Sequence, residues 1–341
     1  FRSPFGAVSC NKKINIKLKV RVDNVDGIFL WLFKDNGQQE KIELNLLDIK
    51  RGGKIYGKEI CTPSFPGLLW YYFMVIFNGK TYYYGNNPTQ TGGIGQITDK
   101  VPPAYQITVY KEDLSTPNWF KESIIYQIFP DRFYNGHDIV LNPKKNSLIH
   151  AHWDNEPIYI RDETGRVVRW DFFGGNLEGI RKKLPYLKSL GINIIYLNPI
   201  FESPSNHRYD TGDYHKIDPM LGDNRLFRDL CAEAKEMGIS IILDGVFSHT
   251  GSDSIYFNKE GNYDSLGAYQ SMESPYYRWY RFIDFPDQYE SWWGIDTLPN
   301  VNELEPSYQD FIIFDRNSVV KYWLRNGIKG WRLDVVDELP G

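Results

Sequence analysis

One joint between a helix and a strand repeats three times in the second half of this sequence. Each time, apolar residues recur at the helical spacing of three or four, a glycine ends the pattern, and a predicted strand follows. The glycines are Gly191, Gly238 and Gly327, and the runs that follow them are Ile192–Leu197, Ile239–Leu243 and Trp331–Val336. Helices that alternate with short strands are typical of βαβ units, and therefore of a parallel sheet.

The residues around these joints favour the same arrangement. Asn176 and Asp223 come just before two of the helices, and their short polar side chains can cap a first helical turn. The first two runs lack polar alternation, which predicts strands that are covered on both faces. With an opening strand at Ile124–Ile128, we expect four parallel strands with helices outside them.

Polar residues lie where the predicted strands end. In β/α barrels and in open doubly wound sheets alike, ligand chemistry gathers at the carboxyl ends of the strands. The residues at those ends are Asn198, Asp244 and Asp334. A long segment rich in aromatic residues and glycine separates the third strand from the fourth, and its length predicts an inserted lobe beside the site.

Residues 1–113 have a different pattern. Short alternating runs, among them Ile14–Val22 and Trp70–Phe77, are separated by Gly, Pro and Asn. This pattern is typical of a small β-sandwich. Pro102, Pro103 and the segment Leu114–Trp119 indicate a linker into the α/β region of residues 114–341.

Composition limits the classes of partner. The net charge is −4, and no dense Lys and Arg cluster indicates contacts with a nucleic acid backbone. No run of 18 apolar residues indicates a membrane span. The three cysteines, Cys10, Cys61 and Cys231, are too few for a disulfide framework, which favours a cytoplasmic protein, with secretion left open.

Arg332 and Asp334 form the most informative pair of charged residues. Strand alternation directs both side chains to the same side, where the guanidinium can keep the carboxylate ionised. An ionised, oriented carboxylate is what a glycosidic nucleophile requires. For a single Asp at the end of a strand, a structural role such as helix capping is an equally good interpretation, and the arginine favours the catalytic one.

Four segments, in order, resemble the α-amylase family of glycoside hydrolases. They are Tyr126–Phe133 on the first strand, Asn206–Tyr214 after the second, Asp244–His249 after the third and Gly330–Glu338 on the fourth. The resemblance covers residues 115–341 and implies the first half of a (β/α)8 barrel. The preceding β domain resembles the starch-binding-type module of the neopullulanase, cyclomaltodextrinase and amylopullulanase branch.

The resemblance also implies roles for individual residues. Asp334 would be the nucleophile of a retaining mechanism, with Arg332 as its electrostatic partner. Tyr209 would stack on the sugar at the cleaved position, His249 would hydrogen-bond a hydroxyl of that sugar, and Asp244 would brace the site. The implied substrates are α-1,4-linked and α-1,6-linked glucans such as starch, pullulan, cyclodextrins and maltooligosaccharides.

The inserted lobe is expected at about residues 250–302. Trp292 and Trp293 within it are candidates for stacking on sugars, and packing in the core of the lobe is an equally good interpretation. Glu338 comes four residues after Asp334, where related enzymes shape the side that receives the acceptor.

Two departures from the family pattern bear on metal binding. Ser248 stands where the family usually has an Asn that contributes to a calcium site. Asn135-Gly136-His137 and Gly174-Gly175-Asn176 stand where the neopullulanase branch has Asp at the third position of each triplet. Because Ca²⁺ prefers carboxylate oxygens, we predict no tightly bound calcium and no other cofactor.

The family's acid/base Glu belongs to a fifth strand and a further Asp to a seventh. Neither matches a residue of this chain, so we expect a portion of a larger enzyme that is inactive alone. The alternative is a short chain that binds α-glucan without cleaving it. The resemblance to the neopullulanase branch also implies a homodimer formed through the N-terminal domain.

Overall fold

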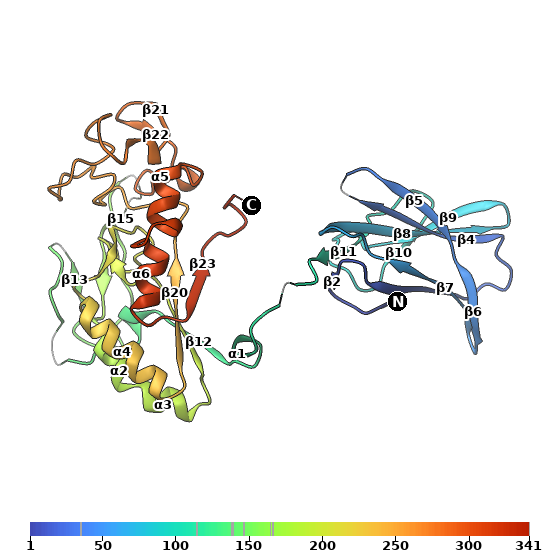
Figure 1. Ribbon diagram of the computed structural model, residues 1–341, viewed down its shortest axis with the longest axis horizontal. Coiled ribbons are helices and arrows are strands. Elements are labelled where there is room, and N and C mark those ends of the chain that lie inside the picture. Colours follow the sequence, from blue (N-terminus) through green and yellow to red (C-terminus); the bar gives the residue numbers. More distant parts are fainter. Residues whose placement is uncertain are drawn as a thin grey trace. The chain divides into compact units, whose positions relative to one another are not determined.

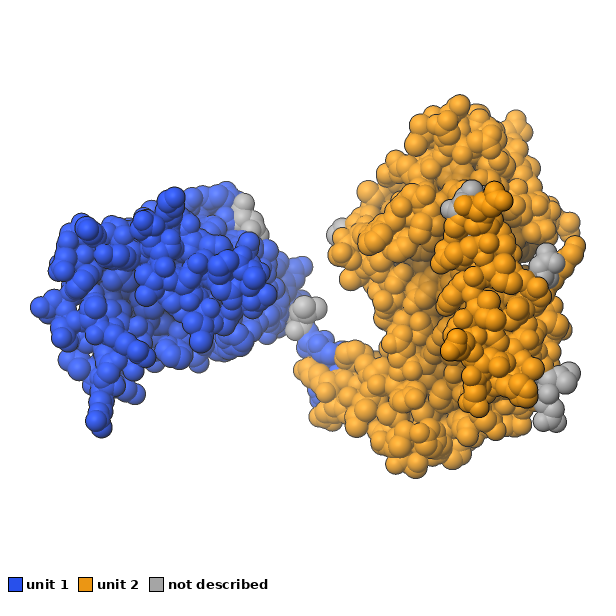
Figure 2. All heavy atoms as spheres, turned by 180° about the vertical axis from the view of Figure 1, so that it is seen from behind, with its two compact units in different colours: residues 1–118 blue, residues 119–341 orange. Residues whose placement is uncertain are grey.

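A computed structural model describes residues 1–34, 36–113, 115–137, 140–145, 147–163, 165 and 167–340. The chain divides into two compact units, Phe1–Asn118 and Trp119–Gly341, which Figure 2 shows in different colours. The sequence predicted this boundary between residues 113 and 114, and Leu114 lies outside the described residues.

Unit 1 contains two β-sheets. The four-stranded sheet has the order β1 (Arg2–Ser3), β3 (Lys13–Val20), β7 (Gly53–Cys61) and β6 (Asn45–Lys50). The seven-stranded sheet contains β2 (Val8–Ser9), β4 (Gly27–Lys34), β5 (Gln39–Glu43), β8 (Gly67–Phe77), β9 (Lys80–Gly85), β10 (Gln96–Thr98) and β11 (Tyr105–Tyr110). One hydrophobic core holds buried side chains from both sheets, including Ile14 and Ile16 of β3 and Ile28 and Leu30 of β4.

Unit 2 is built on a four-stranded parallel sheet. Its order is β12 (Ile125–Ile128), β17 (Ile194–Leu197), β20 (Ser240–Gly245) and β23 (Gly330–Leu333). Figure 1 labels β12, β20 and β23. The four predicted strands are therefore confirmed, but the prediction that the last one reaches Val336 is wrong. The strand ends at Leu333 because Val335 has a φ of 40° and the chain turns there.

The helices that connect these strands begin as predicted. The Asn176 side chain accepts a hydrogen bond from Gly179 N at 2.8 Å, and the Asp223 side chain accepts one from Leu226 N at 2.7 Å. The first predicted helix is divided into two, because Pro185 cannot donate a backbone hydrogen bond. The main helices are α2 (Leu177–Lys182), α3 (Leu184–Ser189), α4 (Asn224–Glu236) and α6 (Val319–Arg325).

Short elements connect the sheet to its surroundings. The short helices are α1 (Asn118–Lys121), η1 (Pro130–Arg132), α5 (Pro306–Gln309) and the π-helix η4 (Asp310–Phe314). Strand pairs are β13 (Leu148–Ile149) with β16 (Asp171–Phe172), β14 (Ile160–Arg161) with β15 (Val167–Arg169), and β18 (Phe201–Glu202) with β19 (Asp213–Ile217). In the part of the chain that the structure describes, no helix is long and apolar enough to cross a membrane.

The segment after β20 contains the residues predicted as an inserted lobe. It includes β21 (Phe282–Asp284), β22 (Gln288–Tyr289) and the 3-10 turns η2 (Tyr277–Trp279) and η3 (Trp292–Gly294). Its aromatic residues, among them Tyr256, Phe257 and Trp279, belong to the same hydrophobic core as Leu197 and Leu243 of the sheet. The lobe therefore packs as an extension of that core.

Candidate active site

The carboxyl ends of three neighbouring strands bring the predicted residues together. Asp244 of β20 pairs in register with Arg332 of β23, and Asp334 follows the end of β23. Asp334 N donates to Gly245 O at 3.1 Å, which holds this residue against the end of β20. Tyr209 comes from the loop between β18 and β19.

Asp244 lies at the centre of this group, and its side chain is fully buried. Its Oδ1 accepts from Arg332 Nη1 at 2.9 Å, and its Oδ2 accepts from the hydroxyl groups of Tyr209, at 2.9 Å, and Tyr196. Burial raises the pKa of Asp244, although these three donors act in the opposite direction. Because both oxygens are occupied, the carboxylate fits the bracing role that the resemblance implied.

Arg332 links the bracing carboxylate to the candidate nucleophile. The same Nη1 that contacts Asp244 also donates to Asp334 Oδ1. The two carboxylates and their hydrogen bonds raise the pKa of the Arg332 guanidinium, which therefore stays charged. The Asp334 side chain is 14% exposed, so it is mostly shielded from water but a small part of it remains accessible. The predicted approach of Arg332 to Asp334 is present.

Tyr196 and Asn198 extend the group beyond the predicted contacts. Asn198 Nδ2 donates to the Tyr209 hydroxyl at 3.2 Å, and Gln127 Nε2 donates to Asn198 Oδ1 at 2.9 Å. A cavity of about 310 Å³ lies beside them, lined by Gln127, Phe129, Asn198 and His207. The sequence analysis singled out Asn198 by its place at a strand end but did not foresee Tyr196, Gln127 or His207.

His249 is buried beyond the end of β20. Ser248 Oγ lies 3.0 Å from its Nδ1, whereas its Nε2 is buried and has no hydrogen-bond partner among the described residues. Burial lowers the pKa of His249 to about 4, while the nearby Asp334 carboxylate acts in the opposite direction. The ring is therefore neutral near pH 7, and its buried Nε2 makes no side-chain hydrogen bond among the described residues.

Hydrogen bonds from two other elements hold the backbone of the segment that carries His249. The Tyr214 hydroxyl of β19 donates to Val246 O at 2.6 Å and contacts His249 O at 3.1 Å. The Tyr308 hydroxyl of α5 donates to Phe247 O at 2.9 Å. Both tyrosines are almost completely buried, so these hydrogen bonds form away from water.

Trp292, Trp293 and Glu338 form a second group at the same end of the sheet. The two indole rings stack at 5.1 Å with an angle of 18° between their planes. Their Nε1 atoms donate to the two oxygens of one carboxylate, Glu338, at 3.0 and 3.2 Å. Trp293 is 79% exposed, and the Trp292 ring lies 5.4 Å from the ring of His249. This exposure contradicts the core-packing interpretation for Trp293, whereas Trp292 is half-buried.

The two segments considered for calcium are joined by an amide contact. Asn176 Nδ2 donates to Asn135 Oδ1 at 2.8 Å, and Asn176 Oδ1 accepts from Gly136 N and Gly179 N. These amide oxygens therefore already have donors. Within the described ranges, no three His, Cys, Asp or Glu side chains form a group that could hold a metal ion.

Comparisons with known proteins identify the family of this chain. Residues 127–340 match the family model described as alpha amylase, catalytic domain. The amylopullulanase of Thermoanaerobacter thermohydrosulfuricus is 42% identical to this chain. The alignment is 379 residues long and covers 99% of this chain and 25% of that protein. Neopullulanase 2 of Thermoactinomyces vulgaris is 35% identical over 268 residues, covering 76% of this chain and 41% of that protein.

A solved structure agrees over nearly the whole chain. The type III pullulan hydrolase from Thermococcus kodakarensis has a TM-score of 0.56 and 27% identity, covering 98% of this chain and 55% of that chain. This chain therefore spans between a quarter and about two fifths of the length of the two curated relatives above.

Proposed function

Because the chain belongs to the α-amylase family, we propose that it is the part of a retaining α-glucan hydrolase that carries the catalytic nucleophile, Asp334. The catalytic domains of this family are (β/α)8 barrels of mixed α/β structure. The named relatives, an amylopullulanase and a neopullulanase, support starch, pullulan and related α-glucans as the substrate class.

The contact between Arg332 and Asp334 is the observation that carries this proposal. A retaining mechanism begins when an ionised carboxylate attacks the anomeric carbon of the sugar. The C–O bond to the enzyme forms, and the bond to the leaving oxygen breaks as an acid gives that oxygen a proton. Arg332 donates to Asp334 and orients its carboxylate, while Asp244 has both oxygens engaged by other donors. The acid is expected from a later strand of the barrel.

Tyr209 and His249 would recognise the sugar that is attacked. The Tyr209 hydroxyl is held by Asp244 and Asn198, which fixes the ring for stacking on the apolar face of a sugar. His249 Nε2 needs a hydrogen-bond partner, and a sugar hydroxyl can supply one. A neutral imidazole can accept or donate there, according to its tautomer.

Trp292 and Trp293 would contact a neighbouring sugar unit. Both indole N–H groups are satisfied by Glu338, so the exposed ring face of Trp293 is free for apolar contact. Glu338 would then act through the tryptophans, by fixing their orientation.

Unit 1 would be a β-sandwich that holds the polymer. On β4, Phe29, Trp31 and Phe33 alternate with buried core residues and lie on the opposite face of the sheet. Trp31 pairs in register with Tyr72 of β8, and their rings lie 6.3 Å apart and within 4° of parallel. Flat aromatic faces of this kind suit neutral sugar rings.

A fluoride substrate tests the nucleophile without the acid, because fluoride leaves unprotonated. An α-maltosyl fluoride with a second fluorine on the reacting ring should release fluoride and leave the glycosyl group on Asp334. Peptide mass spectrometry should locate this adduct, and Asp334→Asn should abolish it while glucan binding remains measurable. An adduct on another residue, or none in a protein that contains the complete barrel, would refute the assignment.

A further inference from the structure

The charge of this chain is divided unevenly between its two units. Residues 1–118 contain 15 Lys and Arg against 10 Asp and Glu, a net charge of +5, whereas residues 119–341 contain 24 against 33, a net charge of −9. The net charge of −4 for the whole chain, which argued against anionic partners, is therefore the sum over a basic unit and an acidic unit. A basic unit attached to an acidic one will attract anions through its own surface.

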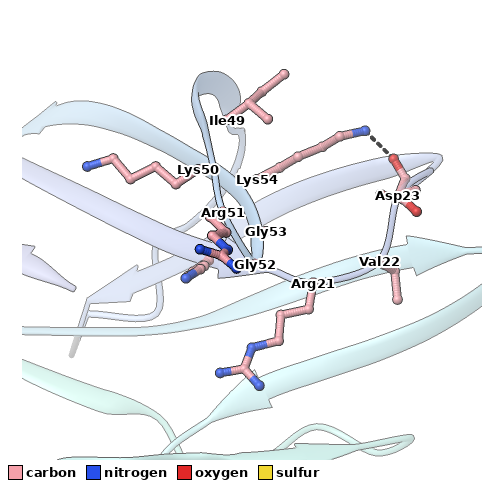
Figure 3. Close-up of a pocket in the computed structure, with 10 residues that line it drawn as sticks. Arg21, Val22, Asp23, Ile49, Lys50, Arg51, Gly52, Gly53 and Lys54 are labelled. Carbon is pink, nitrogen blue, oxygen red and sulfur yellow. Dashed lines mark hydrogen bonds between the residues drawn. The ribbon is translucent and has the colours of Figure 1, made fainter.

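The positive charge of unit 1 is concentrated at one end of its four-stranded sheet. A pocket of about 600 Å³ lies between the end of β3 and the turn that joins β6 to β7 (Figure 3). Five basic side chains line it: Lys19, Arg21, Lys50, Arg51 and Lys54. Asp23 is the one acidic lining residue, and Lys54 donates to its backbone carbonyl oxygen. Lys50 Nζ also lies 3.5 Å from the Asp48 carboxylate, and with this pair included the pocket still has an excess of positive charge.

The turn at this pocket is held close to β3. Gly53 has a φ of 142°, and a Cβ atom there would lie 2.5 Å from the carbonyl oxygen of Val20. A side chain at position 53 would therefore push the hairpin away from the end of β3. The close approach keeps the basic residues of both segments around one hollow.

The residues that line the pocket favour an anionic ligand over a neutral sugar ring or a nucleobase. None of the ten lining residues is aromatic, so the pocket has no flat surface for a neutral sugar or for a nucleobase. Its volume lies in the range of small-molecule sites, but such sites are mostly apolar. Here Val22 and Ile49 are the two lining residues with apolar side chains.

We propose that this pocket binds phosphate groups carried by a polysaccharide. A phosphate ester presents a charge near −2 and several acceptor oxygens, which ammonium and guanidinium groups match. The proposal rests on the proposed function, because an α-glucan hydrolase would meet phosphate esters as substituents on its polymer. The pocket would retain modified chains, while neutral chains would be held by the aromatic face of β4 and β8.

The position of the apolar residues argues against a membrane surface as the partner. Ile49, which is 68% exposed, and Val22 lie in the pocket among five basic side chains that outnumber them. Leu46 and Leu47 are also exposed, but they lie at the start of β6, and five residues of extended chain, about 16 Å, separate Leu46 from Arg51. The tip of the hairpin carries Arg51 instead of an apolar side chain. Interfacial binding would require apolar residues at the part that enters the membrane first.

The test compares one polymer with and without its phosphate. The whole chain would be measured against immobilised amylopectin that carries phosphate monoesters, and against the same polymer after phosphatase treatment. We expect tighter binding to the phosphorylated form, weakening with salt. Lys50→Gln with Arg51→Gln should weaken binding to that form about tenfold and leave binding to the treated form unchanged.

A second double variant, which removes two positive charges outside the pocket, controls for the change in net charge. Lys17→Gln with Lys58→Gln removes two exposed charges from the same sheet outside the pocket, and this variant should bind like the unmodified chain. Equal affinity for both polymers, an equal loss in the control pair, or a preference for phosphatidylglycerol vesicles would overturn the proposal. Equal binding to both polymers together with a normal fluoride adduct would leave the hydrolase assignment intact.

Discussion

The Tyr209 hydroxyl donates to Asp244 Oδ2 at 2.9 Å, although the two residues lie 35 positions apart in the chain. Asp244 is anchored at the end of a buried strand, whereas Tyr209 belongs to a loop. The hydrogen bond therefore fixes a loop residue against the sheet. Arg332 and Tyr196 also donate to this carboxylate, so both of its oxygens are engaged and it is suited to bracing the site. Burial of this group raises the pKa of Tyr209 to about 12, so the phenol remains a donor.

Tyr196→Phe should destabilise unit 2 by about 1–3 kcal/mol. The variant leaves the buried Asp244 carboxylate with one donor fewer, and loss of a hydrogen bond to a buried charge costs this amount. Urea unfolding followed by circular dichroism would measure the change. Tyr126→Phe, on the neighbouring strand β12, is the control, because its hydroxyl makes no hydrogen bond recorded for the described residues. Equal effects of the two variants would contradict the bracing role of Asp244.

His249 should make unit 2 less stable as the pH falls. Its pKa is about 4 in the folded protein and 6.5 when exposed, so the unfolded chain binds the proton first. The contribution to the free energy of unfolding is complete above pH 6.5 and is lost progressively down to pH 4. The full shift corresponds to roughly 3 kcal/mol.

His249→Asn isolates this effect because asparagine does not titrate. We expect the melting temperature to fall less between pH 7 and pH 4.5 in the variant than in the unmodified chain. Differential scanning calorimetry at both pH values would measure the difference. Parallel curves for the two proteins would mean that the imidazole titrates normally.

Glu338→Ala should release both tryptophans of the stacked pair. Each indole loses its acceptor, so we expect fluorescence quenching by acrylamide to increase and binding of maltoheptaose to weaken by about 1–2 kcal/mol. Glu290→Ala removes an exposed carboxylate of the same lobe that pairs with Arg281, and it should change neither property. Unchanged quenching in the Glu338 variant would show that the indoles are held by other contacts.

Chelation should leave the melting temperature of the chain unchanged. The side chains of Asn135 and Asn176 join the two segments by a direct hydrogen bond, and the Asn176 oxygen already accepts two backbone hydrogen bonds. Thermal unfolding with and without EDTA would measure this, followed by addition of Ca²⁺. A fall of several degrees that Ca²⁺ reverses would mean that a cation is bound.

Local signals predicted much of the fold and of the primary site. Caps such as Asn176 and stops such as Gly238 mark helix ends within a few residues of sequence, so the strand positions follow. Alternation along one strand was enough to bring Arg332 beside Asp334. Asp244 was found because the end of a buried strand is a chemically informative place in parallel sheets.

Contacts between distant segments were not predictable in the same way. Tyr196 reads as one apolar position among others in its strand, and its contact with Asp244 depends on the pairing of β17 with β20. Trp293 has a φ of 51°, a conformation that no local pattern indicates for a tryptophan. The early end of β23 depends on a similar turn at Val335. The basic pocket is formed by two segments, and neither of them alone has a sequence pattern that predicts a binding site.

The buried hydroxyl groups of Tyr214 and Tyr308 have a consequence for how a ligand is received. They engage the carbonyl groups of residues 246, 247 and 249, so the backbone that carries His249 is ordered before any sugar arrives. This segment therefore loses little conformational entropy when a sugar binds. Selectivity at His249 should arise from rejection of sugars that do not fit a fixed shape, and not from adjustment around those that do.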